Sequence, residues 1–478
     1  MQIILFYSIA PLVIASLLIP LLRNRQYIKM KGIIGAAALV ITLGIWAYEY
    51  FSGAISSWLI SSSPVSDLAR YFLPDWLSLL VAVVAIIGGL LALPLARRLT
   101  GNQTVYISIV LIGVGGTIVL ASTLNPFLIV ASWGLVSVAS YALASIAKDR
   151  DSLINSVKYA IMGAIAFQFL VIAVFLIYSS IGNPSGALLL DLGLLLLMAA
   201  IGFKIGIPPF HMWLPDLYGY SEPLSVAPLS AIMKLGPIAL LLRLMLAQAP
   251  SGPEMEALLA VLVVLSIVAM TFGNVTALVQ KNIQRMMAYS SMAQVGYMLM
   301  AITVAFASFS TRDYTSFYFS VGGLLIYLLA YSASKAGIFT LIKGVRSGRE
   351  VTLTDIRGLS ATNGAQSASF TILLLNLIGL PPLVGFWGKL LIFASAANPE
   401  LSFFYIGGVP WFALIGIINS VISVFYYMKI VRSMYGDSEK VRGHDAPARR
   451  FEGLNLVIFA STIIVVVVGI IVPVLLVI

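Results

Sequence analysis

Residues 204–211 read KIGIPPFH, and residues 378–383 read IGLPPL. Both stretches set a glycine and two prolines inside a long apolar run. A helix cannot continue through tandem prolines, because two backbone N–H donors are lost and each ring crowds the preceding turn. Such a break survives at membrane depth only where protein or a wet cavity satisfies the freed carbonyls. We therefore predict a membrane protein with two broken helices. The breaking prolines are Pro208, Pro209, Pro381 and Pro382.

The rest of the chain is equally apolar. Of its 478 residues, 60% are hydrophobic and 10% are charged, and the mean hydropathy is +1.03. A soluble domain carries roughly 25% charged residues, so the polar surface here is too small to cover a water-facing globule. The apolar segments have about the 20 residues that cross a hydrocarbon core. The sequence therefore predicts an all-α polytopic membrane protein of fourteen spans. These are residues 3–22, 32–51, 77–95, 105–124, 126–147, 157–179, 187–205, 224–248, 255–278, 286–306, 317–342, 367–397, 403–435 and 454–478.

Targeting and redox signals are sparse. The segment 3–22 has no basic start and no small-residue cleavage site, so we expect a span and not a removed signal peptide. The chain has no cysteine. Disulfides, thiol nucleophiles and cysteine-bound metals are therefore excluded.

The net charge of +10 has a topological explanation. With fourteen spans, the loops that follow odd-numbered spans share one side, and most of the Lys and Arg residues lie in them. Because these residues are retained on the cytoplasmic side, we expect both termini of a multi-pass cell-membrane protein to face outward. A nucleic-acid partner is not needed to explain the basic excess.

The paired breaks also suggest an internal repeat. Matching Gly/Pro interruptions in two halves are typical of transporters built from inverted repeats. We predict two five-helix repeats, at 105–248 and 255–435, with 1–104 and 454–478 outside them. The alternative is that prolines are simply commoner in membrane helices.

Five lysines lie inside the apolar segments, and they are the candidates for chemistry. A lysine near the bilayer centre costs at least about 2.5 to 3.5 kcal/mol on insertion scales, so it is a functional candidate. Burial penalises the charged form, so that a buried lysine can exchange a proton near neutral pH. The five are Lys158, Lys204, Lys234, Lys335 and Lys389.

Their positions separate the five lysines. Lys204 lies four residues before the first break, and Lys389 lies seven residues after the second. Lys234 is close to Gly236 and Pro237. The alternative is a lysine that reaches from a helix end to the interface, and it applies best to Lys158, at the start of its segment.

His211 follows the first break and could relay protons at physiological pH, or it could orient a carbonyl of the broken helix. We expect no metal site, because two histidines, no cysteine and no clustered intramembrane carboxylates leave too few ligands. We also expect no strand and no glycine-rich nucleotide loop.

Several motifs in order resemble the antiporter-like subunits of respiratory complex I and their Mrp relatives. Residues 203–216 read FKIGIPPFHMWLPD and lead through Glu222 and Pro223 to Lys234. Further matching motifs are GN at 273–274 with ALVQ at 277–280, Arg285 with AYSS at 288–291, GLPP at 379–382, GF at 385–386, GK at 388–389, SVKY at 156–159 and YY at 426–427. The resemblance covers roughly residues 105–435. Size, span count and the lysine after Gly388 are most similar to the subunit N branch, whereas Lys335 is more typical of the other antiporter-like subunits.

The resemblance implies a role for each lysine. Lys204 would be the channel lysine of the first half, Lys234 the central relay and Lys389 the terminal lysine. The chain would be a proton-translocating membrane-arm subunit of an NADH (or other reduced-donor):quinone oxidoreductase, with other membrane-arm subunits as partners. It would itself bind no flavin, iron–sulfur cluster or quinone. One residue departs from the family, because Gly134 stands where a glutamate usually pairs with Lys158 or Lys204.

Three alternatives stay open. The same fold could serve a multi-subunit cation/proton antiporter or a membrane-bound hydrogenase. It could also be a non-pumping structural subunit whose half-channel has decayed, as Gly134 would suggest. A stand-alone secondary transporter is the third.

Overall fold

The computed structural model describes residues 2–22, 27–52, 73, 75–99, 102–181, 186–247, 253–345, 350–436 and 451–477. Nearly all of these residues are helical. They form two compact units, which are described separately. The first unit comprises Met1–Gly206 with Ala231–Met255, and the second comprises Ile207–Ser230 with Glu256–Ile478.

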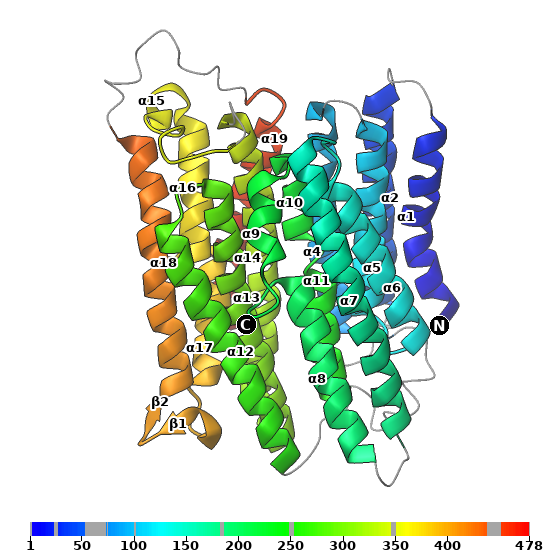
Figure 1. Ribbon diagram of the computed structural model, residues 1–478, viewed down its shortest axis with the longest axis vertical. Helices are drawn as coiled ribbons and strands as arrows, with labels where there is room; N and C mark the ends of the chain where they lie inside the picture. Colours follow the sequence, from blue (N-terminus) through cyan, green and yellow to red (C-terminus); the bar gives the residue numbers. More distant parts are fainter. Residues whose placement is uncertain are drawn as a thin grey trace. The chain divides into compact units, whose positions relative to one another are not determined.

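The first unit is built around α5 (Gln103–Ala121), which contacts five other helices of the unit (Figure 1). Those helices are α1 (Gln2–Leu21), α2 (Ile28–Phe51), α4 (Trp76–Ala92), α6 (Pro126–Ala144) and α11 (Leu235–Ala247). The short 3-10 helix η2 (Leu93–Arg98) continues α4, and α7 (Arg150–Ser180) packs along α8 (Gly186–Ile205).

Local sequence explains where several of these helices begin. The Asp75 side chain accepts a hydrogen bond from the Ser78 amide at 2.8 Å and so caps α4. Asn125 caps α6 in the same way, immediately before Pro126. Such caps satisfy amides that have no partner within the helix.

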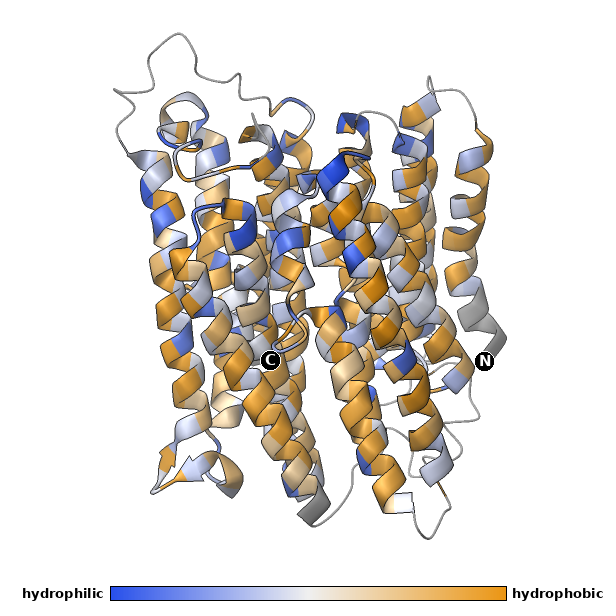
Figure 2. Cartoon of the chain, viewed as in Figure 1, coloured by the Kyte–Doolittle hydropathy of each residue, from blue (hydrophilic) through white to orange (hydrophobic). Residues whose placement is uncertain are grey.

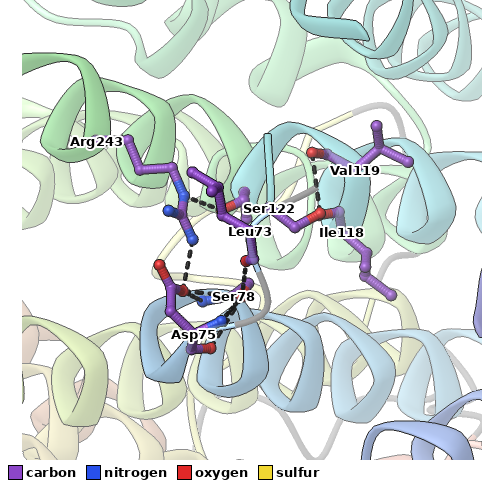
Figure 3. A network of polar contacts seen from close by, with 8 residues as sticks. Leu73, Asp75, Ser78, Ile118, Val119, Ser122 and Arg243 are labelled. Atoms are coloured by element: carbon purple, nitrogen blue, oxygen red, sulfur yellow. Dashed lines mark hydrogen bonds and ion pairs between the residues drawn. The ribbon is translucent and has the colours of Figure 1, made fainter. Parts of the chain in front are cut away.

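A buried ion pair ties α4 to α11 (Figure 3). Arg243 on α11 donates to Asp75 Oδ1 at 2.6 Å, and its Nε donates to the Ala121 carbonyl at the end of α5. The Arg243 and Asp75 side chains are only 2% and 13% exposed. One guanidinium on α11 thus joins the start of α4 and the end of α5, which lie 168 and 122 residues away along the chain.

The second unit surrounds α14 (Tyr314–Val345), which contacts α13 (Ile283–Thr311), α16 (Gly364–Ile378), α17 (Val384–Ala396) and α19 (Asn455–Val477). Its remaining helices are α9 (Trp213–Tyr220), α10 (Pro223–Ala231), α12 (Pro253–Val279), α15 (Leu359–Thr362), the 3-10 helix η3 (Ser402–Phe404) and α18 (Trp411–Tyr435). α13 and α14 are almost entirely buried.

Both predicted helix breaks are confirmed. α8 ends at Ile205 and α16 ends at Ile378, each just before its glycine and tandem prolines. Gly206 and Gly379 have φ of 78° and 90°, in the left-handed region where glycine carries no steric penalty. The Pro208–Pro209 and Pro381–Pro382 peptide bonds are both cis.

A third interruption was not predicted. Residues 232–234 form a turn between α10 and α11, so Lys234 lies outside both helices. Pro237 explains the turn, because it has no N–H to donate to the Met233 carbonyl and its ring crowds that carbonyl.

The expectation of unbroken helix from residue 403, with no strand, is wrong. Strands β1 (Tyr405–Ile406) and β2 (Val409–Pro410) pair antiparallel before α18 begins at Trp411. Gly407 and Gly408 connect them with φ of 59° and 80°. Two successive positive φ values suit the tight hairpin turns that match strand twist.

Twelve described helical segments are long and apolar enough to cross a membrane, with α4–η2 and α10–α11 each counted as one segment. Tyr7–Leu21, Gly364–Ile378 and Val384–Ala396 are shorter apolar helices. Figure 2 shows apolar residues along most of each long helix. The predicted polytopic helical fold is confirmed. The count of fourteen spans and the two inverted repeats stay predictions.

Candidate functional site

Four of the five intramembrane lysines are buried. Their exposed fractions are 3% for Lys204, 2% for Lys234, 0% for Lys335 and 3% for Lys389. Lys158 is exposed on α7. α7 begins at Arg150, so Lys158 lies eight residues inside the helix and not at its end. The next residue, Tyr159, is buried.

Lys204 lies in a cage of hydroxyls and aromatic rings in the first unit. Its Nζ donates to Ser137 Oγ at 3.1 Å and to Ser140 Oγ at 3.0 Å. The Tyr141 and Tyr159 ring centroids are 5.3 Å and 5.6 Å from the same nitrogen. Ring faces attract cations, so the cage stabilises an ammonium without a carboxylate.

Gly134 lies one turn before Ser137 on α6. A Cβ atom built at Gly134 would meet no other atom within 4 Å. Arg243–Asp75, Arg285–Asp216 and Lys343–Glu222 are ion pairs between described residues, and none of these three pairs includes Lys204. Serine hydroxyls therefore take the place beside Lys204 that the resemblance gives to a glutamate.

Lys234 lies in a turn that packs closely against α5, with one glycine on each side of the contact. A Cβ atom at Gly113 of α5 would overlap the Met233 side chain. A Cβ atom at Gly236 would approach Leu120 within 3.1 Å. These two glycines let the turn pack closely against α5.

Lys389 binds the end of the broken helix α16 in the second unit. Its Nζ donates to the Leu377 and Ile378 carbonyls, both at 3.0 Å, and to Ser420 Oγ at 3.1 Å. The last carbonyls of a helix lack N–H partners within it and favour a cation. The Tyr297 ring centroid lies 4.3 Å from Nζ. The tandem-proline break thus supplies the ligands of Lys389.

Lys335 is held between α14 and α13. Its Nζ donates to the Met287 carbonyl at 2.9 Å and to Ser290 Oγ at 3.2 Å. The Tyr331 ring centroid is 5.6 Å away. Lys335 and Lys389 therefore both have polar surroundings within the second unit.

Two polar residues for which the sequence predicted no role connect the surroundings of Lys335 and Lys389. Gln294 and Tyr427 are both fully buried. Gln294 Nε2 donates a hydrogen bond to Tyr427 Oη at 3.0 Å. Ser290 lies one helical turn from Gln294 on α13. In the sequence, Ser290 and Gln294 are two polar residues four positions apart in a strongly apolar segment, and this spacing could have indicated their role.

His211 lies after the first break. Its ring packs edge-on against the Phe272 ring, and the two ring centroids are 4.8 Å apart. Burial lowers the pKa of His211 below its ordinary value, and a hydrogen bond to the Pro209 backbone partly offsets this. That hydrogen bond favours the interpretation that His211 orients a carbonyl of the broken segment.

Among the described residues, no three His, Cys, Asp or Glu side chains lie together as possible metal ligands. Some of the described charged residues form ion pairs. Within the second unit, Arg285 Nη2 donates to Asp216 Oδ1 at 2.8 Å, and Lys343 Nζ lies 2.8 Å from Glu222 Oε1.

Buried lysines beside broken helices define a polytopic membrane protein of the transporter class. Residues 123–422 match the family described as "NADH:quinone oxidoreductase/Mrp antiporter, TM", and the chain belongs to that family.

Named relatives agree with this family. The chain is 30% identical over 454 residues to NADH-quinone oxidoreductase subunit N 2 of Roseiflexus castenholzii, covering 90% of this chain and 86% of the relative. A chain of respiratory complex I from Thermus thermophilus superimposes with a TM-score of 0.76 and 26% identity, covering 97% of both chains. A chain of the Mrp complex from Dietzia sp. shares the fold, with a TM-score of 0.80, 19% identity and coverage of 99% and 95%.

Proposed function

We propose that this chain is a proton-translocating membrane-arm subunit of a complex I-type NADH (or other reduced-donor):quinone oxidoreductase. The observation that carries the proposal is the set of four buried lysines, each at a helix break or beside buried hydroxyls. The names of the relatives support the assignment to this complex. Electron transfer would occur in other subunits, and this chain would contribute no cofactor.

In this proposal, the lysines are stations that hold a proton for a limited time. Lys204, Lys234 and Lys389 would be the relay residues, with Lys335 in support. Each lysine that is solvated by hydroxyls or carbonyls can lose its proton without leaving a buried carboxylate unpaired. Redox chemistry elsewhere in the complex would change the electrostatic potential at these lysines and so drive the transfer.

The test is to replace Lys204 or Lys389 by Met in the assembled complex and measure the proton-to-electron ratio. Methionine keeps the length and removes the charge. We expect each variant to lower the ratio, while the exposed Lys281→Met variant keeps the wild-type ratio. An unchanged ratio in both Lys204→Met and Lys389→Met would refute the relay and favour the structural-subunit alternative.

A second candidate is a subunit of a multi-subunit cation/proton antiporter, which the shared fold with the Dietzia chain favours. Native purification from membranes separates the candidates. Co-purification of flavin- and iron–sulfur-containing subunits supports the oxidoreductase, and a set of antiporter subunits without redox centres supports the alternative.

We also propose that the protein lies in the cell membrane with both termini outside. Because the chain has no cysteine, a single cysteine added at either terminus is a unique label. A membrane-impermeant maleimide should label both positions in intact cells, and protection of either one would contradict this topology.

A further inference from the structure

A continuous chain of hydrogen bonds joins two buried lysines of the second unit. Starting from Lys335, the path runs to Ser290 Oγ at 3.2 Å and from there to Tyr427 Oη at 2.6 Å. Tyr427 Oη accepts from Gln294 Nε2 at 3.0 Å. The same Nε2 donates to the Leu377 carbonyl at 3.2 Å, and Lys389 Nζ donates to that carbonyl at 3.0 Å. All of these groups are buried.

The Leu377 carbonyl determines the direction of the hydrogen bonds. A carbonyl can only accept, so the amide atom that faces it must be the NH₂ group of Gln294. The other end of the amide is then Oε1, which accepts from the Tyr327 hydroxyl. Because Tyr427 accepts from Gln294, its own proton is free to point to Ser290. The Gln294 orientation is therefore set by three neighbours.

The members of this chain differ in whether they can pass a proton. A hydroxyl accepts and donates through one oxygen, so Ser290 and Tyr427 can take up one proton as they release another. An amide donates from nitrogen and accepts at oxygen, so passing a proton would leave an imidic acid that must rearrange. The pathway therefore conducts next to Lys335 and stops at Gln294. The Leu377 carbonyl carries no proton, but Gln294 Nε2 and Lys389 Nζ lie 3.2 Å and 3.0 Å from its oxygen. A side chain at position 294 that can release a proton would therefore face Lys389 around this one shared oxygen.

We propose that Gln294 is an insulating residue that blocks direct proton transfer between Lys335 and Lys389. It positions Tyr327 and Tyr427 but does not carry the proton. The two lysines would then exchange protons only when water or a side-chain movement bypasses the amide, which is what coupling to redox chemistry requires. This inference rests on the proposed proton-translocating function.

The direct test replaces the insulator by a conductor of nearly the same shape. In Gln294→Glu, a carboxyl group can accept a proton on one oxygen and release one from the other. We expect the assembled complex in proteoliposomes to show a several-fold higher passive proton leak without electron transfer. The measurement is the decay of an imposed pH gradient, followed with a pH-sensitive dye.

Two further variants distinguish conduction from loosened packing. Gln294→Met lacks a proton-carrying group and should show no added leak. Gln294→Glu combined with Tyr427→Phe removes the next hydroxyl and should abolish the leak of the single variant. A leak in Gln294→Met, a leak that persists in the double variant, or no leak in an assembled Gln294→Glu complex would overturn the inference.

The failure of this inference can be told apart from failure of the proposed function. If Lys389→Met lowers the proton-to-electron ratio and Gln294→Glu does not leak, the chain moves protons but Gln294 is not the insulator. If neither lysine variant changes the ratio, the proposed function itself is wrong.

Discussion

At the scale of single residues, solvation by neutral groups distinguishes this chain from the pattern that its resemblance implies. Lys204 is surrounded by Ser137, Ser140 and two tyrosine rings, and Gly134 stands where the family resemblance implies a glutamate. Hydrogen bonds to a charged group are each worth about 1.5 to 3 kcal/mol. Two of them can therefore offset much of the cost of burying the ammonium.

Ser140 should matter more than Ser137. Ser140 Oγ accepts from both Lys204 and the Tyr159 hydroxyl, at 3.0 Å and 3.2 Å. Ser140→Ala would leave two buried donors without this partner, at about 1 to 3 kcal/mol each. We expect a larger fall in pumping and in thermal stability for Ser140→Ala than for Ser137→Ala. Equal effects would show that the shared hydrogen bond is unimportant.

His211 should make stability depend on pH. Its ordinary pKa is 6.5, and burial lowers it in the folded protein. As the pH falls, His211 of the unfolded chain binds a proton before His211 of the folded protein does. The contribution of His211 to the free energy of unfolding is therefore complete above about pH 6.5 and is lost as the pH falls below it. In a thermal unfolding series from neutral to acidic pH, the wild type should lose more stability than His211→Asn. Parallel curves for both proteins would contradict the prediction.

At the scale of secondary structure elements, the second break both ends a helix and builds a lysine site. Gly379 takes φ of 90°, which turns the chain away after Ile378. The carbonyls left without helical partners then bind Lys389. Asn376 fixes the other side of the break, because its Oδ1 accepts from the Gly385 amide at 2.7 Å.

Gly379→Ala should therefore disturb the site. An alanine at this φ is strained by about 1 to 2 kcal/mol, and its Cβ would lie 3.0 Å from Lys389 Cδ. We expect a lower thermal stability and a lower proton-to-electron ratio. The matched control is Gly322→Ala in α14, where a Cβ meets nothing within 4 Å and alanine favours the helix by about 0.5 to 1 kcal/mol. Equal melting temperatures for the two variants would contradict the prediction.

At the scale of the whole molecule, long-range polar contacts hold each unit together where apolar packing is not specific. The Arg243–Asp75 pair of the first unit joins residues 168 positions apart (Figure 3). Removing one partner of a buried pair leaves an uncompensated charge and lowers the free energy of unfolding by about 3 to 5 kcal/mol. An exposed pair is worth about 0 to 1 kcal/mol.

Asp75→Asn should therefore reduce the yield of folded protein and its melting temperature far more than Asp216→Asn. The latter affects the Arg285–Asp216 pair, whose side chains are 32% and 43% exposed. The double variant Arg243→Met with Asp75→Asn should recover much of the loss, because no unpaired charge remains. A double variant as unstable as Asp75→Asn would show that the charge is not the cause.

The membrane class, the long helices and the two tandem-proline breaks can all be read from the sequence. These follow from local chemistry: apolar length, missing N–H donors and left-handed glycines act on the residues beside them. The sequence also identified Lys204 and Lys389 as candidates through their nearness to those breaks, and Lys234 through the neighbouring Gly236 and Pro237.

Only the tertiary structure decided that Lys158 is exposed while Lys335 is fully buried, and that Ser137 and Ser140 solvate Lys204. It alone placed Gln294 beside Leu377 and Tyr427, which are 83 and 133 residues away along the chain. Burial and hydrogen-bond polarity depend on which helices pack together. Helical periodicity determines which face of one helix a residue occupies, but the partner of that face comes from the assembled core.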